Sequence, residues 1–257
     1  MLIVLSPAKT LDFESPVSVA EHSEPAMLEE SARLVARLRE FDAPALGQLM
    51  DISPALAELN VGRFQSWQPP FSAGNARQAV LAFAGDVYDG LQASSLGAPG
   101  LRWAQRHLRI LSGLYGVLRP LDLIQAYRLE MGTRLDNPRG RDLYAFWGER
   151  IAAQLREAMA GLAQPVLVNL ASDEYFRAVR RPALPHPVVQ PVFQEWRGSG
   201  WKVISFNAKR ARGTMTRYAI ENRITDPHDL KRFDLDGYRY DAAASDEASW
   251  VFRRAAA

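Results

Sequence analysis

Apolar side chains follow two patterns along the chain, and these patterns predict both buried strands and amphipathic helices. The short continuous apolar run at 2–5 is typical of a fully buried strand, and 166–170, apolar except for Asn169, is a second candidate. Residues 27–41 instead place apolar or small side chains at helical spacing, which predicts a helix with one buried face. Further helices are predicted at 45–50, 54–59, from Asn75 onward, at 141–162 as the longest, at 207–222 and at 226–232, with strands at 188–193, at 201–206, near Tyr238 and near Val251.

The irregular order of these elements predicts the fold class. Strands alternate with helices, but the connections between strands are uneven in length, which argues against a regular doubly wound fold. We therefore expect a mixed α/β (α+β) fold, with residues 1–257 forming a single domain around a mixed sheet. Residues 26–70 are expected to form a helical sub-structure within it.

Composition narrows the possible chemistry. Hydrophobic residues make up 47% and charged residues 23%, as in ordinary globular proteins. No apolar run approaches the roughly 20 residues of a membrane span, and no signal peptide is recognisable, so we expect a cytoplasmic protein without membrane partners. The absence of cysteine excludes disulfides and thiolate metal sites. The four histidines are scattered, so neither a metal site nor a cofactor is predicted, although carboxylates could accept Mg²⁺.

Positive charge is concentrated in two segments that contain no acidic residue. The net charge is only +2, yet the segments 90–121 and 196–220 carry arginine and lysine alone. Such blocks indicate patches that face a polyanion or a phosphorylated ligand, although solvated helix faces explain either block equally well. The cations are Arg102, Arg106, Arg109 and Arg119 in the first segment, and Arg197, Lys202, Lys209, Arg210, Arg212 and Arg217 in the second.

Polar motifs follow both predicted buried strands. Ser6-Pro7-Ala8-Lys9-Thr10 comes directly after the first strand, and Asn169 through Tyr175 follows the strand at 166–170. Loops at the carboxyl ends of buried strands are where α/β proteins place ligands. Lys9 would supply a positive charge there, or would simply be a surface lysine at a strand exit. Helix capping explains Ser172 and the acids after it, but does not explain Asn169.

Three other segments carry candidate chemistry. Gly85-Asp86-Val87-Tyr88 could contribute a carboxylate. If 127–131 is extended, Arg128 and Glu130 share a face and form an ion pair or a ligand contact. Lys209-Arg210-Ala211-Arg212 would lie in the first turns of a helix capped by Asn207. Cations at a helix N-terminus oppose the helix dipole, which is costly unless an anion binds there.

Residues 49–57 are a possible DNA-binding element. Two predicted helices flank the tight turn Asp51-Ile52-Ser53, an arrangement similar to a helix-hairpin-helix. That element normally has glycines where Asp51 and Ser53 stand, so the match is degenerate. An ordinary corner between two helices is the alternative.

Six motifs in order resemble the YaaA family of bacterial peroxide-stress proteins. They are the segments 6–10, 85–88, 111–122, 127–132, 169–175 and 208–212. The resemblance implies a cytosolic protein that protects cells against hydrogen peroxide and limits iron-dependent oxidative DNA damage. It also implies an unusual α/β fold that binds DNA, without sequence specificity or by DNA structure, through a helix-hairpin-helix near 46–64 and a positively charged cleft.

Two overlapping sets of residues are nominated, the first by the resemblance and the second by the two acid-free basic segments. The polar residues of the cleft would be Lys9, Asp86, Arg119, Arg128, Glu130, Asn169, Asp173, Lys209 and Arg212. The DNA-binding candidates are Arg106, Arg109, Lys209, Arg210, Arg212 and Arg217, with Trp67, Tyr115 and Trp147 available to stack on bases if they are exposed.

Three functions are compatible with these residues. DNA binding in the stress response is the first. The second is an enzyme acting on a small phosphorylated or nucleotide-like substrate, because carboxylates in the cleft suit acid–base chemistry better than phosphate tracking. That hypothesis requires Lys9 and Lys209 to lie in one pocket. An iron site built from carboxylates alone is the third. The sequence assigns no reaction and no catalytic residue.

Overall fold

The computed structural model describes residues 1–17 and 19–255, and its centre is a mixed eight-stranded sheet. The strands are β1 (Leu2–Leu5), β5 (Leu108–Ser112), β6 (Gly116–Leu118), β8 (Leu167–Leu170), β9 (Val188–Trp196), β10 (Trp201–Lys202), β11 (Arg239–Tyr240) and β12 (Ser249–Arg254). Their order is β11-β12-β9-β8-β1-β5-β6, with β10 paired to β9. The predicted mixed α/β fold is therefore confirmed.

Strand β1 lies inside this sheet, between β8 and β5. It pairs in parallel with β5 on one side and β8 on the other, so that Leu5 is opposite both Ile110 and Leu170. Strands β9 and β12 extend the parallel part, whereas β6, β10 and β11 are antiparallel to their neighbours. The four residues of β1 are fully buried, as expected for a continuous apolar run in a strand covered on both faces.

Helices and short strands connect the sheet. The α-helices are α1 (Leu28–Leu38), α2 (Ala43–Met50), α3 (Pro54–Ser66), α4 (Ala79–Ala82), α5 (Asp86–Leu91), α6 (Gly97–His107), α7 (Leu143–Trp147), α8 (Arg150–Met159), α9 (Asp173–Phe176) and α10 (Ser205–Glu221). The 3₁₀ turns are η1 (Ala93–Ser95), η2 (Arg177–Val179), η3 (Arg181–Ala183), η4 (Pro227–Arg232), η5 (Leu235–Gly237) and η6 (Ala242–Ala244). Two small sheets pair β2 (Thr10–Leu11) with β4 (Phe83–Ala84), and β3 (Arg77–Gln78) with β7 (Leu123–Ile124).

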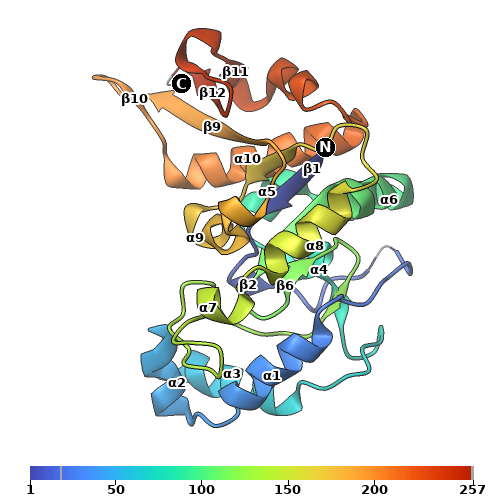
Figure 1. The fold of residues 1–257 in the computed structure, drawn as a ribbon, viewed down its shortest axis with the longest axis vertical. Coiled ribbons are helices and arrows are strands. Elements are labelled where there is room, and N and C mark those ends of the chain that lie inside the picture. The colour runs from blue at the N-terminus through green and yellow to red at the C-terminus, as the bar shows by residue number, and fades with distance from the viewer. Residues whose placement is uncertain (18, 256–257) are drawn as a thin grey trace.

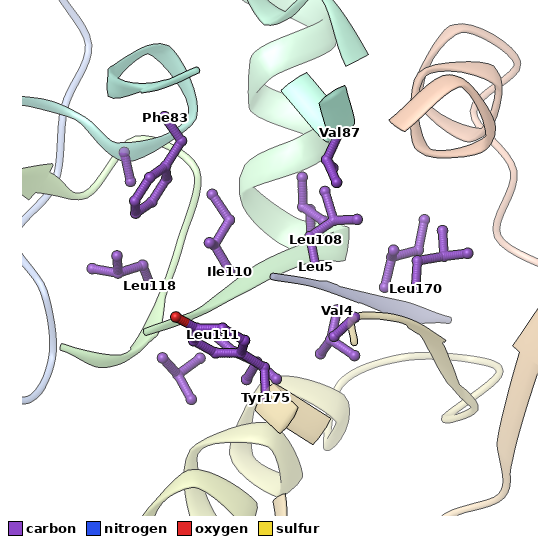
Figure 2. Close-up of a cluster of buried hydrophobic side chains, with 14 of the residues drawn as sticks. Val4, Leu5, Phe83, Val87, Leu108, Ile110, Leu111, Leu118, Leu170 and Tyr175 are labelled. Atoms are coloured by element: carbon purple, nitrogen blue, oxygen red, sulfur yellow. The ribbon is translucent and has the colours of Figure 1, made fainter. Parts of the chain in front are cut away.

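Alternating side chains of the central strands form the core on both faces of the sheet. Leu5 and Ile110 point toward the face on which Phe83 and Val87 lie, while Val4 points toward Tyr175 on the other face (Figure 2). Because of this period of two, successive apolar residues of a short central strand pack into the core on opposite faces of the sheet.

Helices α5 and α10 touch along their backbones because each has a glycine at the contact. A Cβ atom on Gly213 would lie 1.8 Å from the carbonyl oxygen of Val87. One on Gly90 would lie 2.2 Å from the carbonyl oxygen of Arg210. No other residue type fits at either position, and the contact fixes α10 against the start of α5.

Helices α1, α2 and α3 gather at one end of the molecule, and β9, β10, β11 and β12 at the opposite end (Figure 1). The predicted helical segment at 26–70 contains these three helices. The side chain of Asp42 caps α2 and that of Ser53 caps α3, while Asp51 adopts a left-handed conformation with φ 51° in the turn between them. No helix in the described part of the chain is long and apolar enough to cross a membrane.

Several predicted element boundaries were wrong. The helix predicted at 141–162 is divided into α7 and α8 because Gly148 takes a positive φ of 52°, and α10, with 17 residues, is the longest helix. Asn75 caps no helix; its side chain accepts a hydrogen bond from the amide of Ser72 in a turn. Helix α10 begins at Ser205, so the strand predicted at 201–206 ends at Lys202.

Candidate functional site

A pocket opens where the neighbouring strands β1 and β8 end. Ser6 follows β1 and Ser172 follows β8, and the two serines link the strand exits. The amide of Ser172 donates to Ser6 Oγ at 2.8 Å, and the two hydroxyl oxygens are 3.2 Å apart. Ser172 precedes α9 but its hydroxyl does not cap that helix. Parallel strands side by side thus bring residues 6 and 172 together across most of the sequence.

The segment 84–88 forms a second wall. Strand β4 pairs with β2, which places Ala84 opposite Thr10. Gly85, with φ 136°, then turns the chain into α5, whose first residue is Asp86. The Tyr88 hydroxyl donates to the carbonyl oxygen of Ser6 at 3.0 Å. The motif after β1 and the Gly-Asp motif are therefore held next to each other.

Helix α10 adds two cations. Its backbone contact with α5 places Lys209 Nζ 3.8 Å from Asp86 Oδ2. Arg212 lies one turn of the helix further on and is partly buried. Burial lowers the pKa of its guanidinium, and the nearby Asp173 carboxylate acts in the opposite direction. Because α10 begins at Ser205, Lys209 is in its second turn, further from the helix N-terminus than a cap at Asn207 would place it.

Glu130 forms ion pairs with two further cations, Lys9 and Arg128. Lys9 Nζ is 3.1 Å from Glu130 Oε2, and Arg128 Nη2 donates to Glu130 Oε1 at 2.9 Å. The predicted pairing of Arg128 with Glu130 is therefore confirmed. The Nε of Arg128 is buried and has no hydrogen-bond partner within the described residues.

These segments enclose a pocket of about 510 Å³, which we call the Lys9–Lys209 pocket. It contains three cations and three carboxylates, so its charge is nearly balanced. Burial raises the pKa of both Tyr88 and Tyr175 well above the ordinary value for tyrosine, so both phenols stay protonated at physiological pH. The lining residues are Ser6, Pro7, Ala8, Lys9, Thr10, Ala84, Gly85, Asp86, Val87, Tyr88, Glu130, Ser172, Glu174, Tyr175, Lys209 and Arg212.

Four of the residues nominated for the cleft lie outside this lining. Arg128 stands behind Glu130 and lines a small neighbouring cavity of about 20 Å³. Asn169 is buried, and its Oδ1 accepts a hydrogen bond from the amide of Ala171 at 3.0 Å, so it shapes the end of β8. Asp173 is exposed at the start of α9. Arg119 forms an ion pair of 3.0 Å with the buried Asp122 and lines no part of the pocket.

The DNA-binding candidates separate into two groups. Lys209 and Arg212 line the pocket, and Arg210 is exposed beside them on α10. Arg106 is exposed on α6, away from the lining.

Arg109 and Arg217 are tied to their own surroundings. Arg109 donates to the carbonyl oxygens of Gln105 and Leu108, and burial lowers its pKa to about 10. Arg217 forms an ion pair of 2.7 Å with Glu221 and donates to the carbonyl oxygen of Leu91. The first acid-free segment, 90–121, thus contributes nothing to the pocket lining.

The aromatic residues considered for base stacking are unavailable for it. Trp67, Tyr115 and Trp147 are buried, with exposed fractions of 3%, 0% and 0%. By contrast, Phe206, on the first turn of α10, is 60% exposed.

Sequence reasoning missed several lining residues. Tyr88, Ser172, Glu174 and Tyr175 were quoted within motifs but were not nominated. Tyr88 and Tyr175 gave no signal apart from their neighbours, because a tyrosine beside an apolar residue is ordinary in a core. Among the described residues, no group of three or more histidine, aspartate or glutamate side chains is placed to hold a metal ion.

The fold and this site define a mixed α/β protein with a charged pocket at the carboxyl ends of its central parallel strands. The sequence matches the family described as peroxide stress protein YaaA over residues 1–244. The chain therefore belongs to the YaaA family of peroxide stress proteins, as its motifs had predicted.

Relatives of similar length support the assignment. A UPF0246 protein of Chromobacterium violaceum is 58% identical over 254 residues, covering 99% of each chain. A UPF0246 protein of Cupriavidus metallidurans is 58% identical over 257 residues, covering 99% of this chain and 98% of its own. A third, of Bordetella petrii, is 57% identical over 256 residues, covering 100% of both chains.

Proposed function

We propose that the Lys9–Lys209 pocket binds a phosphorylated, nucleotide-like ligand, and that the protein acts as an enzyme on this ligand in the peroxide stress response. One observation carries the proposal: Lys9 and Lys209, 200 positions apart in the sequence, reach the same pocket. Each of them has a carboxylate partner within that pocket, Glu130 for Lys9 and Asp86 for Lys209.

The size and charge of the pocket suit such a ligand. Its volume of about 510 Å³ is within the usual range for small-molecule sites. The cations would contact phosphate oxygens, whereas the carboxylates would accept hydrogen bonds from sugar hydroxyls or base amino groups. A surface that only follows a phosphate backbone has little use for three carboxylates.

The ion pairs give a physical account of ligand entry. A phosphate that approaches Lys9 or Lys209 competes with Glu130 or Asp86 for the ammonium group. Glu130 would then lose one cationic partner while keeping Arg128, which leaves a carboxylate beside the bound ligand. A carboxylate in that position is suited to act as a general base.

Titration calorimetry with the four nucleoside 5′-monophosphates, each compared with its unphosphorylated nucleoside, tests this proposal. We expect at least one monophosphate to bind, and Lys209→Met and Lys9→Met each to weaken it roughly 10- to 100-fold, the value of a lost charged hydrogen bond. Lys202→Met, which removes an exposed lysine on β10, is the matched control and should bind normally. Binding that does not depend on the phosphate, or that both pocket variants retain, would refute the proposal.

A second function, DNA binding that limits iron-dependent oxidative damage, is favoured by residues beside the pocket. Phe206 and Arg210 are exposed and lie one helical turn apart on α10. An exposed aromatic ring next to a cation is the combination with which proteins bind single strands, by stacking on a base and contacting the phosphate. Both side chains lie on the helix that carries Lys209 into the pocket.

The hairpin of α2 and α3 has the wrong charge for this role. Between Arg39 and Arg63 the sequence has no lysine, arginine or histidine, but it has four acidic residues. Asp51, in the turn itself, is one of them and is exposed. A turn that carries negative charge repels phosphate, so we assign DNA contact to α10 and not to the hairpin.

Fluorescence anisotropy with a labelled single-stranded oligonucleotide, at several salt concentrations, tests DNA binding. Phe206→Ala should weaken binding about 5- to 100-fold without changing the salt dependence, since stacking on one base contributes about 1–3 kcal/mol. Arg210→Ala should flatten the slope of log K against log salt by about 0.7. A variant that binds the strand more weakly should also protect it less against damage by Fe(II) and peroxide.

Two control variants locate the binding surface in this experiment. Leu235→Ala removes an exposed apolar side chain on η5 and should have no effect. Ala55→Glu adds charge beside the hairpin turn, at an exposed position of α3, and should also have no effect. If Ala55→Glu abolishes binding while the α10 variants do not, DNA is contacted by the hairpin instead.

A further inference from the structure

A second pocket, of about 420 Å³, lies outside every residue nominated from the sequence. We call it the arginine pocket. Three of its lining residues are arginines: Arg134 and Arg141 belong to the loop between β7 and α7, and Arg177 begins η2. The remaining lining residues are Gly132, Asp142 and Tyr144.

The three guanidinium groups have no acidic partner. Within residues 1–17 and 19–255, none of Arg134, Arg141 and Arg177 has a carboxylate oxygen within 4.0 Å. Asp142, the acid in the lining, accepts a hydrogen bond from the amide of Ala145 as the cap of α7. Arg139, in the same loop, contrasts with them because it forms hydrogen bonds to both oxygens of Glu30.

Tyr144 holds one of these arginines in place. The Arg177 guanidinium lies 4.7 Å from the centre of the Tyr144 ring. The Tyr144 hydroxyl donates in turn to the carbonyl oxygen of Glu174 at 3.0 Å. A guanidinium that is stacked on a fixed ring loses little conformational entropy when an anion binds.

Glu174 connects this pocket to the Lys9–Lys209 pocket. It lines the latter, and its Oε1 accepts a hydrogen bond at 2.8 Å from the amide of Gly132, which lines the arginine pocket. The two pockets therefore share a wall. Gly132 lies close to this side chain, because a Cβ atom on it would be 3.2 Å from Glu174 Oε1.

We propose that Arg134, Arg141 and Arg177 bind a second phosphate group of the ligand whose first phosphate occupies the Lys9–Lys209 pocket. This inference rests on the proposed function. Three converging cations without an acidic partner repel one another, and a phosphate with several acceptor oxygens satisfies them together. The shared Glu174 wall places this phosphate next to the first pocket. It is either the second phosphate of a nucleoside bisphosphate or the neighbouring phosphodiester of a strand.

Calorimetry with a nucleoside 5′-monophosphate and the matching 3′,5′-bisphosphate tests the proposal for a free nucleotide. Wild type should bind the bisphosphate about tenfold or more tightly. The triple variant Arg134→Ala/Arg141→Ala/Arg177→Ala should lose this preference and keep its affinity for the monophosphate. A labelled ten-residue oligothymidylate is titrated in a second arm. If the second phosphate belongs to a nucleic-acid strand, the triple variant should bind this oligonucleotide more weakly than wild type does, while its binding of the bisphosphate stays unchanged.

Controls separate this inference from the proposed function. Arg156→Ala/Arg232→Ala/Arg239→Ala removes three exposed arginines that line neither pocket and should bind like wild type. Arg177→Lys keeps the charge but loses the planar stack, and should retain only part of the preference. Suppose that the arginine triple variant binds the bisphosphate and the oligonucleotide like wild type, while Lys209→Met no longer binds the monophosphate. The phosphate site in the arginine pocket is then refuted, and the site in the Lys9–Lys209 pocket stands. If no monophosphate binds but oligonucleotide binding depends on the three arginines, the proposed function is refuted and the second phosphate site stands.

Discussion

Individual charged residues around the Lys9–Lys209 pocket are paired but not locked in place. Lys9 and Lys209 keep 65% and 53% of their side-chain surface exposed while they contact Glu130 and Asp86. Ion pairs with that exposure contribute about 0–1 kcal/mol to stability. If Lys9 or Lys209 leaves its carboxylate partner to contact a ligand phosphate, the folded state therefore loses little stability. Both lysines are thus suited to ligand binding.

How far single residues could be identified from the sequence depended on where they stand. Lys9 follows a predicted buried strand, and that local pattern was enough to make it a candidate, whereas Asp86 was nominated mainly through the family resemblance. Arg134, Arg141 and Arg177 belong to no motif. Two of them come from the loop between β7 and α7, which has little regular structure, so no periodicity predicts that they converge.

His107 makes a pH-dependent contribution to stability. It is buried, its ring stacks 4.4 Å from that of Trp103, and its Nδ1 lies 3.0 Å from the carbonyl oxygen of Met1. Burial lowers the pKa of the imidazole, while the hydrogen bond to Met1 acts in the opposite direction. The unfolded chain, with a histidine pKa of about 6.5, takes up the proton first as the pH falls. His107 therefore lowers the free energy of unfolding below about pH 6.5 and has no such effect above it.

Urea unfolding at about pH 7.5 and about pH 5.5 checks this contribution. His107→Phe keeps the stack on Trp103 but loses the hydrogen bond, so it should be about 1 kcal/mol less stable at the higher pH. It should lose less stability than wild type between the two pH values. An equal or larger loss would show that the proton is not taken up at His107.

At the scale of elements, the contact of α5 with α10 positions half of the pocket. Asp86 stands at the start of α5, and Lys209 and Arg212 are on α10, so their geometry depends on two glycines rather than on any polar residue. The sequence predicted α10 but placed its start two residues late, because Asn207 resembles a cap. The start of α3 after its cap Ser53 was placed correctly, whereas α2, which Asp42 caps, was predicted to begin at residue 45 and begins at Ala43.

Gly213→Ala should disrupt this contact. The new Cβ would lie 1.8 Å from the carbonyl oxygen of Val87 and 2.9 Å from the amide nitrogen of Leu91, so α10 must move away. We expect a loss of about 1–3 kcal/mol in urea unfolding, as for other overpacked sites, together with weaker ligand binding. Gly62→Ala, on α3 with open space around it, should instead stabilise by roughly 0.5–1 kcal/mol. A Gly213→Ala protein as stable as wild type would contradict the contact.

At the scale of the whole molecule, the fold class followed from the pattern but the order of the strands did not. The apolar runs at β1 and β8 were recognised, and these two strands are indeed neighbours. Strand β5 was missed because Arg109 interrupts its apolar residues. That guanidinium is satisfied by two backbone carbonyl groups, which is a tertiary arrangement that local sequence cannot reveal. Distant pairings such as β9 with β12 depend on burial of the entire core.

The touching backbones of α5 and α10 also restrict how the binding site could change. A pair of helices without side chains between them has no spacer that could be lengthened or shortened. That side of the cavity is therefore of fixed width. Adaptation to a larger or smaller molecule would have to come from the loops opposite, at 6–10 and 128–134, where insertions leave the helix pair untouched.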